Sequence, residues 1–287
     1  MTASHEPLPR SIVLASVLTL VLTVVATLAG LFVPGFYRDA PVLLPQLYGQ
    51  DLLTLTVAVP ALAVSLVLAV RGSLRGYVIW LGVTGYLLYT YASYAFMTAF
   101  NELYLVYTAL LWLTLSTFVG GMVRLEAAAL KRTLGRMRVR SFVAFQLVVA
   151  VLVAFAWLSE ILPAIAGGTT PPSITAAGLP TSVIYSLDLG IVVPALVCSA
   201  SWLRQRRPWG YAFTAVLLVK LATLGGAVMA MAVVSILEGQ SVPAAQLVVF
   251  GGITVVSIVL TARLLRAIGA DSRPRPVESV SGSRGEA

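Results

Sequence analysis

Two charged residues lie inside long apolar stretches of the sequence. Asp188 belongs to the apolar run 182–202, and Lys220 belongs to the next run, 211–237. An unpaired charge is costly in a hydrocarbon environment, so such residues are expected to pair or to serve a function. At about 1.5 Å per helical residue their depths in a bilayer differ by roughly 7 Å, which a lysine side chain can largely bridge. We therefore predict an Asp188–Lys220 charge pair, with either a functional role or a structural role in fixing helix register.

Other polar side chains recur at helical spacing near these charges. Run 182–202 carries Tyr185 three residues before Asp188, and run 77–96 carries a second polar stripe. Such stripes face the interior of a membrane bundle. The candidates for lining an internal cavity are Tyr86, Tyr89, Thr90, Ser93, Asn101 and Tyr185. The alternative is that these tyrosines only pack or belong to an interfacial aromatic belt.

Three carboxylates lie near the ends of apolar runs, on the side opposite the basic loops. Asp51, Glu102 and Glu160 could form an outer acidic mouth that attracts cations. They are also weak candidates for the acid–base group of a lipid-modifying enzyme. The alternative is that acidic residues are merely tolerated at this interface.

The chain has few residues for metal or thiol chemistry. It contains one cysteine, Cys198, and one histidine, His5. An intramolecular disulfide and a Ser-His-Asp triad with its histidine inside the apolar part of the chain are therefore excluded. No phosphate-binding, dinucleotide-binding or zinc-protease motif is present. We predict no catalytic residue, no metal site and no cofactor, and an enzyme is the less favoured class.

The elements that must position these residues are transmembrane helices. Of 287 residues, 59% are hydrophobic and 10% are charged, whereas soluble domains carry about 25% charged residues. The apolar residues form runs near the 20 residues that span a bilayer, without the alternation of an outer-membrane barrel. The chain is predicted to be an all-α integral membrane protein with eight transmembrane helices, at residues 11–33, 52–70, 77–96, 105–123, 141–162, 182–202, 211–237 and 247–265.

The basic residues predict the orientation. Of the 19 Lys and Arg residues, all but Arg38 and Lys220 lie in alternate loops or at the chain ends. By the positive-inside rule, the N-terminus, the C-terminus and these loops are cytoplasmic, in the plasma membrane. The net charge of +8 is thus explained by topology, and no nucleic-acid partner is expected.

The basic connector 124–140 has two interpretations. As a cationic amphipathic helix it would turn Leu125, Leu130, Leu134 and Met137 to the membrane and bind anionic lipids. As a solvated loop it would only set the topology. The polar tail 269–287 is predicted to be disordered.

A short sequence recurs at an offset of 134 residues. Val59-Pro60-Ala61-Leu62 matches Val193-Pro194-Ala195-Leu196, and a Gly-Tyr pair follows each at the same distance. This predicts two parallel four-helix repeats, residues 1–140 and 141–268, and two matched helix kinks at Pro60 and Pro194. Chance similarity is the alternative.

Two functional classes remain open. The first is a transporter or channel for a small solute or cation, with a cavity between the third, sixth and seventh helices. The second is a membrane-embedded sensor, scaffold or accessory subunit, whose protein partner the sequence does not identify.

Overall fold

The computed structural model describes residues 8–270, and within this range every element is helical. The elements are α1 (Arg10–Phe32), α2 (Leu44–Leu53), the π-helix η1 (Thr54–Ala58), α3 (Val59–Val70), α4 (Leu74–Met97), α5 (Tyr104–Arg124), α6 (Ala127–Leu134), α7 (Arg140–Gly167), α8 (Pro172–Ala176), α9 (Val183–Leu187), the π-helix η2 (Asp188–Val192), α10 (Val193–Arg204), α11 (Pro208–Leu237) and α12 (Ala244–Ala270). His5 and most of the predicted disordered tail lie outside the described residues. The start of that tail, residues 269–270, is the end of α12.

Within residues 8–270, seven helical segments are long and apolar enough to cross a membrane, so the chain is a polytopic α-helical membrane protein. They are Arg10–Phe32, Leu44–Val70, Tyr104–Arg124, Arg140–Gly167, Val183–Arg204, Pro208–Leu237 and Ala244–Ile268. The eighth long helix, α4, has 24 residues but no equally apolar stretch. Most of its residues are buried against neighbouring helices, so α4 has little need of an apolar face toward lipid.

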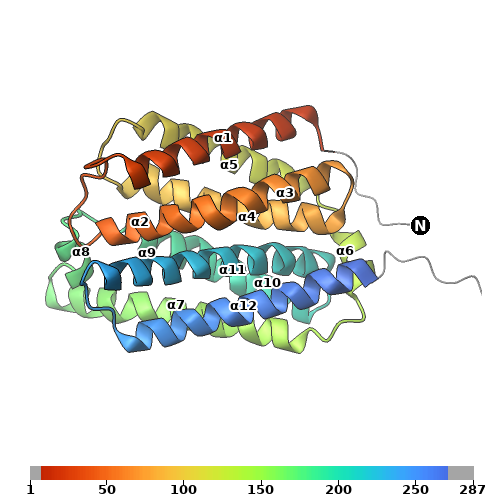
Figure 1. The fold of residues 1–287 in the computed structure, drawn as a ribbon. Coiled ribbons are helices and arrows are strands. Elements are labelled where there is room, and N and C mark those ends of the chain that lie inside the picture. Colours follow the sequence, from red (N-terminus) through yellow and green to blue (C-terminus); the bar gives the residue numbers. More distant parts are fainter. Residues whose placement is uncertain (1–7, 271–287) are drawn as a thin grey trace, which may run out of the picture.

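The helices form two groups that meet at the centre of the molecule. Helices α1 to α5 lie together on one side, and α7 to α12 lie together on the other (Figure 1). The two central helices are α4, which packs against α3 and α5, and α11, which packs against α10 and α12. Since α4 and α11 also pack against each other, residues of both groups meet along the middle of the bundle.

The two groups are in much closer contact on one side of this centre than on the other. On the close side α2 packs along α11: a Cβ added to Gly49 would lie 2.4 Å from the Cα of Met231, and one added to Gly226 would lie 2.9 Å from Leu53. The corresponding contact between α9 and α4 involves few residues. Ala222, Gly226 and Ala230 thus belong to a face on which another helix approaches closely, as small residues permit.

Each group contains a helix interrupted by a π-helical turn directly before a Val-Pro pair. The N–H of Val59 donates to the carbonyl of Thr54, and the N–H of Val193 donates to that of Asp188. Pro60 and Pro194 follow in the first turn of α3 and α10, where the loss of an N–H donor is absorbed by the irregular turn. A wider turn is therefore found where the sequence predicts kinks.

The turns that follow α3 and α10 also match. Gly72 and Arg206 both have positive φ, at 80° and 53°. The next residue in each turn donates its N–H to a carbonyl five positions back, to Leu68 and to Trp202 respectively. These turns bring the start of α4 and of α11 back against the preceding helix.

Two predicted helix boundaries are wrong. The second membrane segment begins at Leu44 instead of residue 52, because the polar residues 50 and 51 are buried inside the protein instead of forming a loop. The fifth continues through Pro163 to Gly167. A proline near a helix end removes only one hydrogen bond, and Gly168, with φ at 61°, ends the helix in the left-handed conformation.

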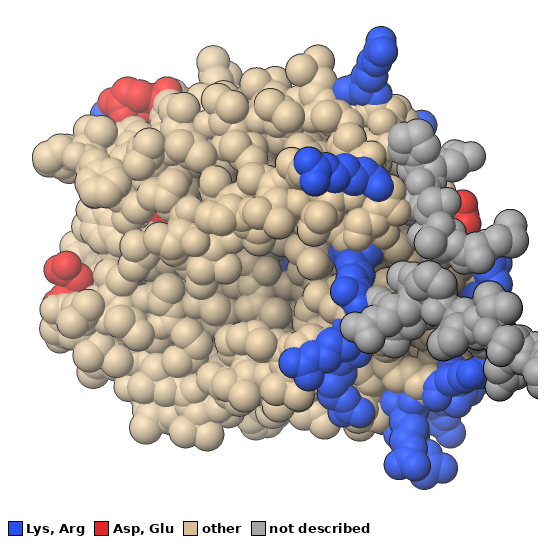
Figure 2. Space-filling view, turned by 45° about the vertical axis from the view of Figure 1, so that its right-hand side comes forward, with Lys and Arg blue, Asp and Glu red and all other residues tan. Residues whose placement is uncertain are grey.

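The basic connector contains a helix, α6, but its apolar side faces the protein. Leu125, Leu130 and Leu134 are all buried, and α6 packs against α11 and α12. The prediction that these leucines face the membrane is therefore wrong, because the protein itself covers them. Lys and Arg side chains gather at this end of the bundle, which we call the basic end, and most acidic side chains lie at the opposite end (Figure 2).

Candidate binding cavity

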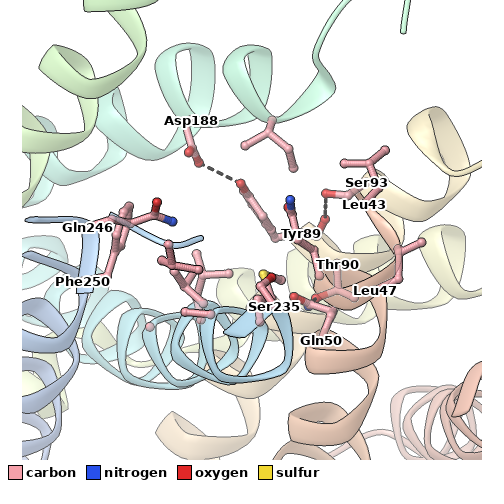
Figure 3. A pocket seen from close by; sticks show the side chains of 18 of the residues that line it. Leu43, Leu47, Gln50, Tyr89, Thr90, Ser93, Asp188, Ser235, Gln246 and Phe250 are labelled. Atoms are coloured by element: carbon pink, nitrogen blue, oxygen red, sulfur yellow. Dashed lines mark hydrogen bonds between the residues drawn. The ribbon is translucent and has the colours of Figure 1, made fainter. Parts of the chain in front are cut away.

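A cavity of about 390 Å³ lies between the two groups of helices. It is on the side where α9 faces α4 with few contacts, opposite the closely packed α2–α11 side. Residues of α2, α4, α7, η2, α11 and α12 line it, together with segments at the end opposite the basic end. The sequence predicted a cavity between α4, the α9–η2–α10 segment and α11. Residues of α2, α7 and α12 also line it. Tyr89 points across this space toward Asp188, and Gln246 enters it from α12 (Figure 3).

The carboxylate of Asp188 is held by donors from two other helices. Trp157 Nε1 of α7 donates to Oδ2 at 2.8 Å, and the Tyr89 hydroxyl of α4 donates to Oδ1 at 3.0 Å. Asp188 is 8% exposed and lines the cavity. Hydrogen bonds to a charged acceptor are the stronger kind, so two aromatic donors from different helices fix this carboxylate at the cavity wall.

Lys220 lies on the other side of Tyr89. Its Nζ is 4.4 Å from the centroid of the Tyr89 ring, and it has no hydrogen-bond partner among the described residues. The Lys220 ammonium and the Asp188 carboxylate form no direct salt bridge. The tyrosine therefore separates the two charges, contacting the anion through its hydroxyl and the cation through its ring face.

A neutral polar network lies among α2, η1 and α4. Gln50 donates to the Tyr86 hydroxyl at 3.0 Å and to Thr90 Oγ1 at 2.7 Å. The hydroxyls of Tyr86 and Thr54 lie 2.7 Å apart. Thr54 and Tyr86 are the residues 134 positions before Asp188 and Lys220. Gln50 and Thr90 reach the cavity wall, whereas Tyr86 is fully buried behind them.

The remaining wall is mostly apolar and aromatic, with a few neutral polar side chains and a second carboxylate, Asp39. Asp39 accepts a hydrogen bond from the backbone N–H of Ala99 at 2.9 Å, and its other oxygen is buried without a partner in the described part of the chain. Burial raises the pKa of the Asp39 carboxyl, and the Ala99 hydrogen bond opposes that shift. Phe250 contributes an aromatic ring. No Lys, Arg or His is among the described residues that line the cavity.

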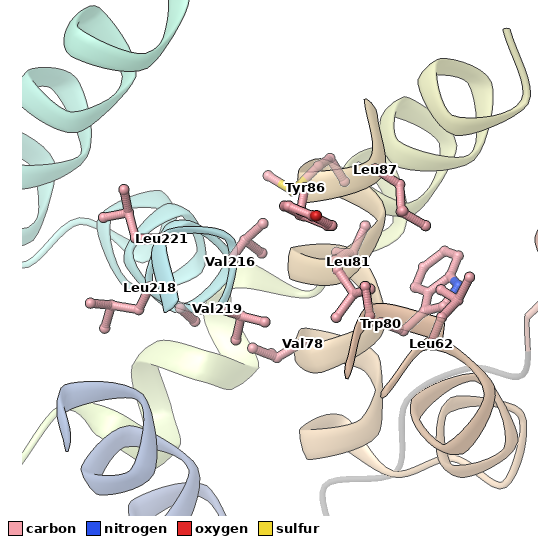
Figure 4. Packing of buried hydrophobic residues seen from close by; sticks show 14 of the residues in the cluster. Leu62, Val78, Trp80, Leu81, Tyr86, Leu87, Val216, Leu218, Val219 and Leu221 are labelled. Carbon is pink, nitrogen blue, oxygen red and sulfur yellow. The ribbon is translucent and has the colours of Figure 1, made fainter. Parts of the chain in front are cut away.

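Toward the basic end the cavity is closed by direct packing of α4 on α11. Val78 and Leu81 of α4 face Val216 and Val219 of α11 (Figure 4). A Cβ added to Gly82 would lie 2.3 Å from Cβ of Val219, which shows how closely the helices approach. The cavity is therefore bounded on this side by buried aliphatic side chains.

Two of the other predicted site residues lie outside the cavity. Asn101 is buried next to Tyr107, and in the turn before α5 its side chain accepts from the backbone N–H of Leu103 at 3.0 Å. Tyr185 faces away from the cavity, where its hydroxyl donates to Glu160 at 2.6 Å. Tyr89, Thr90 and Ser93 do line the cavity.

The three carboxylates of the expected acidic mouth lie in three different places. Glu102 is exposed and pairs with Arg38. Glu160 accepts from Ser173 and Tyr185 beside a separate surface hollow. Asp51 is only 2% exposed and accepts from Tyr37 and, at 2.9 Å, from Tyr94. The structure does not bring these three carboxylates together.

Tyr37, which lies between the first two membrane segments, completes the buried Asp51 cluster. Burial, with the nearby Asp51 charge, raises the pKa of the Tyr37 hydroxyl, which keeps it a neutral donor. A Cβ added to Gly30 of α1 would lie 2.1 Å from the Asp51 carboxylate, so α1 covers the cluster closely. This carboxylate has no basic partner among the described residues.

Sequence reasoning missed several polar residues of the cavity, among them Trp157, Gln50 and Gln246. Trp157 lies near the outer end of the predicted span 141–162, where a tryptophan is usually an interfacial anchor. Its position near one membrane surface was the only signal in the sequence. Gln50 fell in the segment predicted to be a loop. Gln246 directly precedes the last predicted span.

Known proteins do not assign this site a role. The chain matches no protein-family model, no curated protein and no solved structure. Among the described residues, no group of three or more His, Cys, Asp or Glu side chains is placed to hold a metal ion. The function must therefore be argued from the cavity itself.

Proposed function

We propose that this chain is a transporter that moves a small solute through the cavity between its two halves. The observation that carries the proposal is a buried carboxylate, Asp188, held at the wall of a 390 Å³ cavity by Trp157 and Tyr89 from two other helices. A bundle with a purely structural role fills its interior with side chains. A concave space with a few converging polar groups is typical of a ligand site.

The proposal includes eight membrane crossings, with α4 as the third. A 24-residue helix is about 36 Å long, enough to cross the hydrocarbon core. The start of α4 lies at the basic end, where Arg75 donates to the carbonyl of Arg266, and its other end lies near Asp39. Both observations support a crossing helix that its neighbours cover.

We further propose that the two halves are parallel repeats. The π-helices, the helices that follow them and the starts of α4 and α11 all keep the offset of 134 residues. Gly76 and Gly210 each pack against the preceding helix at matching positions, Leu68–Ala69 and Trp202–Leu203. Local geometry thus supports what a few sequence identities suggested, with residues 1–140 and 141–268 as the two units.

We propose that the chain lies in the plasma membrane with its basic end and both chain ends on the cytoplasmic side. Separation of basic from acidic side chains along the bundle supports it. The cavity then faces outward, and the packed α4–α11 contact is the inner barrier. Exposed Lys131 and Arg132 of α6 are available to anionic lipid headgroups.

Solute counterflow in proteoliposomes tests the transport role. The probes are tetraethylammonium, benzoate and glycerol, which represent cationic, anionic and neutral solutes. Counterflow of at least one probe above that of empty liposomes is expected. Val228→Phe adds a ring to the cavity wall and should abolish this flux, because the solute path is filled.

The matched control is Val233→Phe, which makes the same change on the same helix at a side chain 51% exposed on the outer surface. It should transport as the wild type does. Equal flux in the wild type and Val228→Phe would remove the cavity from the transport path. The absence of any flux above empty liposomes would favour the alternative of a sensor, scaffold or accessory subunit.

A further inference from the structure

We infer that the solute is a small organic cation that exchanges with a proton carried by Lys220; this inference rests on the transport role proposed above. Its basis is the arrangement of one cavity carboxylate, one tyrosine and one buried ammonium: Asp188, Tyr89 and Lys220.

The chemistry of the cavity wall selects a cation. Its charged groups among the described residues are the carboxylates of Asp188 and Asp39, and no basic side chain lines it. Aromatic rings of Trp157, Tyr89 and Phe250 are part of the same wall. Carboxylates and aromatic faces together attract ammonium groups, and a mostly apolar wall suits the carbon substituents of an organic ion. Anionic solutes would meet two carboxylates without a counter-charge.

Lys220 competes with such a cation for the same carboxylate. Lys220 is 7% exposed, its ammonium has no hydrogen-bond partner among the described residues, and it contacts the ring of the same tyrosine whose hydroxyl donates to Asp188. Among the described residues, Lys220 is the one positive charge that interacts with Asp188 and can compensate it when no solute is bound. The carboxylate therefore needs either a protonated lysine or a bound cation.

Charge balance makes the two occupants exclude each other. One buried carboxylate compensates one positive charge, and a second positive charge in a low-dielectric interior is unfavourable. When the solute cation binds next to Asp188, an N–H bond of the Lys220 ammonium breaks, the electron pair stays on Nζ, and the proton leaves to water. The site keeps the same net charge. Solute release reverses the step and returns a proton to Nζ.

No other titratable group facing Lys220 takes over this role. Tyr89 of α4 contacts it through the ring face, and Asp188 of η2 accepts a hydrogen bond from the hydroxyl of the same tyrosine. Tyr86 of α4 is bonded within its own neutral network, and Asp51 of α2 is held by Tyr37 and Tyr94. The basic residues on the helices packed against α11 are Arg75 at the start of α4, Lys131 and Arg132 of α6, Arg204 at the end of α10, and Arg263 and Arg266 near the end of α12, and none of these lines the cavity.

The test measures cation binding and proton release together. Tetraethylammonium is titrated into the full-length protein in nanodiscs, with calorimetry for affinity and a pH indicator in weak buffer for protons. We expect about one proton to be released per bound cation. Over the pH range in which Lys220 is protonated, the Kd should fall about tenfold for each unit by which the pH rises. No binding of tetraethylammonium to the wild type would overturn the cation assignment.

Variants assign the proton to its residue. Asp188→Asn should lose binding, whereas Glu102→Gln, which removes an exposed carboxylate outside the cavity, should bind as the wild type does. Lys220→Arg keeps a permanent charge, so it should bind weakly at every pH and release no proton. Proton release by Lys220→Arg equal to that of the wild type would overturn the role of Lys220.

Two further measurements keep the proposals distinguishable. If a single variant fails to fold, the double variant Asp188→Asn with Lys220→Met removes both buried charges, and it should fold but not bind the cation; wild-type affinity in this double variant would overturn the inference. Counterflow of benzoate or glycerol without binding of tetraethylammonium would overturn the cation–proton inference and leave the transport role intact. Stoichiometric binding and proton release without any counterflow would support the exchange site and overturn transport.

Discussion

At the scale of single residues, Tyr89 determines how the two buried charges meet. Its hydroxyl bonds the Asp188 carboxylate and its ring face contacts the Lys220 ammonium, so one side chain serves both. A shorter side chain here would leave the two charges facing each other across a gap. The two charges thus contact the same aromatic side chain and form no direct salt bridge with each other.

Trp157 is expected to contribute to stability as well as to the cavity. Trp157→Phe keeps the aromatic ring but removes the 2.8 Å hydrogen bond to Asp188. The free energy of unfolding should fall by about 1 kcal/mol, because a buried carboxylate loses one of its two donors. Unfolding in mixed detergent and dodecyl sulfate micelles measures it. Trp112→Phe, at a side chain 68% exposed on α5, is the control, and equal losses in both variants would contradict the expectation.

Residue types alone indicated only part of this site. Asp188 and Lys220 were found because charges are rare in apolar runs, and Tyr89, Thr90 and Ser93 because of their helical spacing. That Tyr89 lies between the charges could not be predicted, since side-chain direction depends on the rotation of α4 against η2. Asn101 and Tyr185 share the same spacing but point elsewhere for the same reason.

At the scale of elements, the close contact of α2 with α11 depends on Gly49. In Gly49→Ala the new Cβ would lie 2.4 Å from the Met231 backbone, which cannot move aside cheaply. We expect a loss of about 1 to 3 kcal/mol in the free energy of unfolding, as in other overpacked contacts. The same micelle unfolding assay measures it.

The control for this packing prediction is Gly252→Ala on α12. A Cβ there meets no atom within 4 Å, so alanine should leave stability unchanged or raise it by the usual helix preference. A Gly49→Ala variant as stable as Gly252→Ala would show that α2 and α11 separate without cost.

Elements were predictable where their surroundings are lipid. The long apolar runs identify α1, α5, α7, α11 and α12. Most of the predicted helix ends differ from the observed ones by a few residues. The start of α2 was missed because Gln50 and Asp51 are polar yet bonded to buried tyrosines. Similarly, the spacing of apolar residues gives no sign of the π-helical turns, although the prolines that follow them are visible in the sequence.

At the scale of the whole molecule, labelling of single cysteines tests the proposed orientation. The labelling uses a Cys198→Ser background. Thr170→Cys is at an exposed position at the end opposite the basic end, and Ala128→Cys is at an exposed position of α6 at the basic end. An impermeant maleimide should label the first in intact cells and the second only after permeabilisation. The reverse pattern would contradict the proposed topology.

The unequal contact between the halves has a consequence for symmetry. In a homodimer of identical four-helix subunits, a two-fold axis makes every interface contact occur twice. Such a dimer would contain two copies of any cavity that lies off the axis. One continuous chain is free of that constraint, so the α2–α11 contact can stay closely packed while the opposite side, between η2 and α4, holds a single site. In the two-repeat arrangement that we propose, one copy of the interface can therefore be a packed contact while the other forms the wall of the cavity.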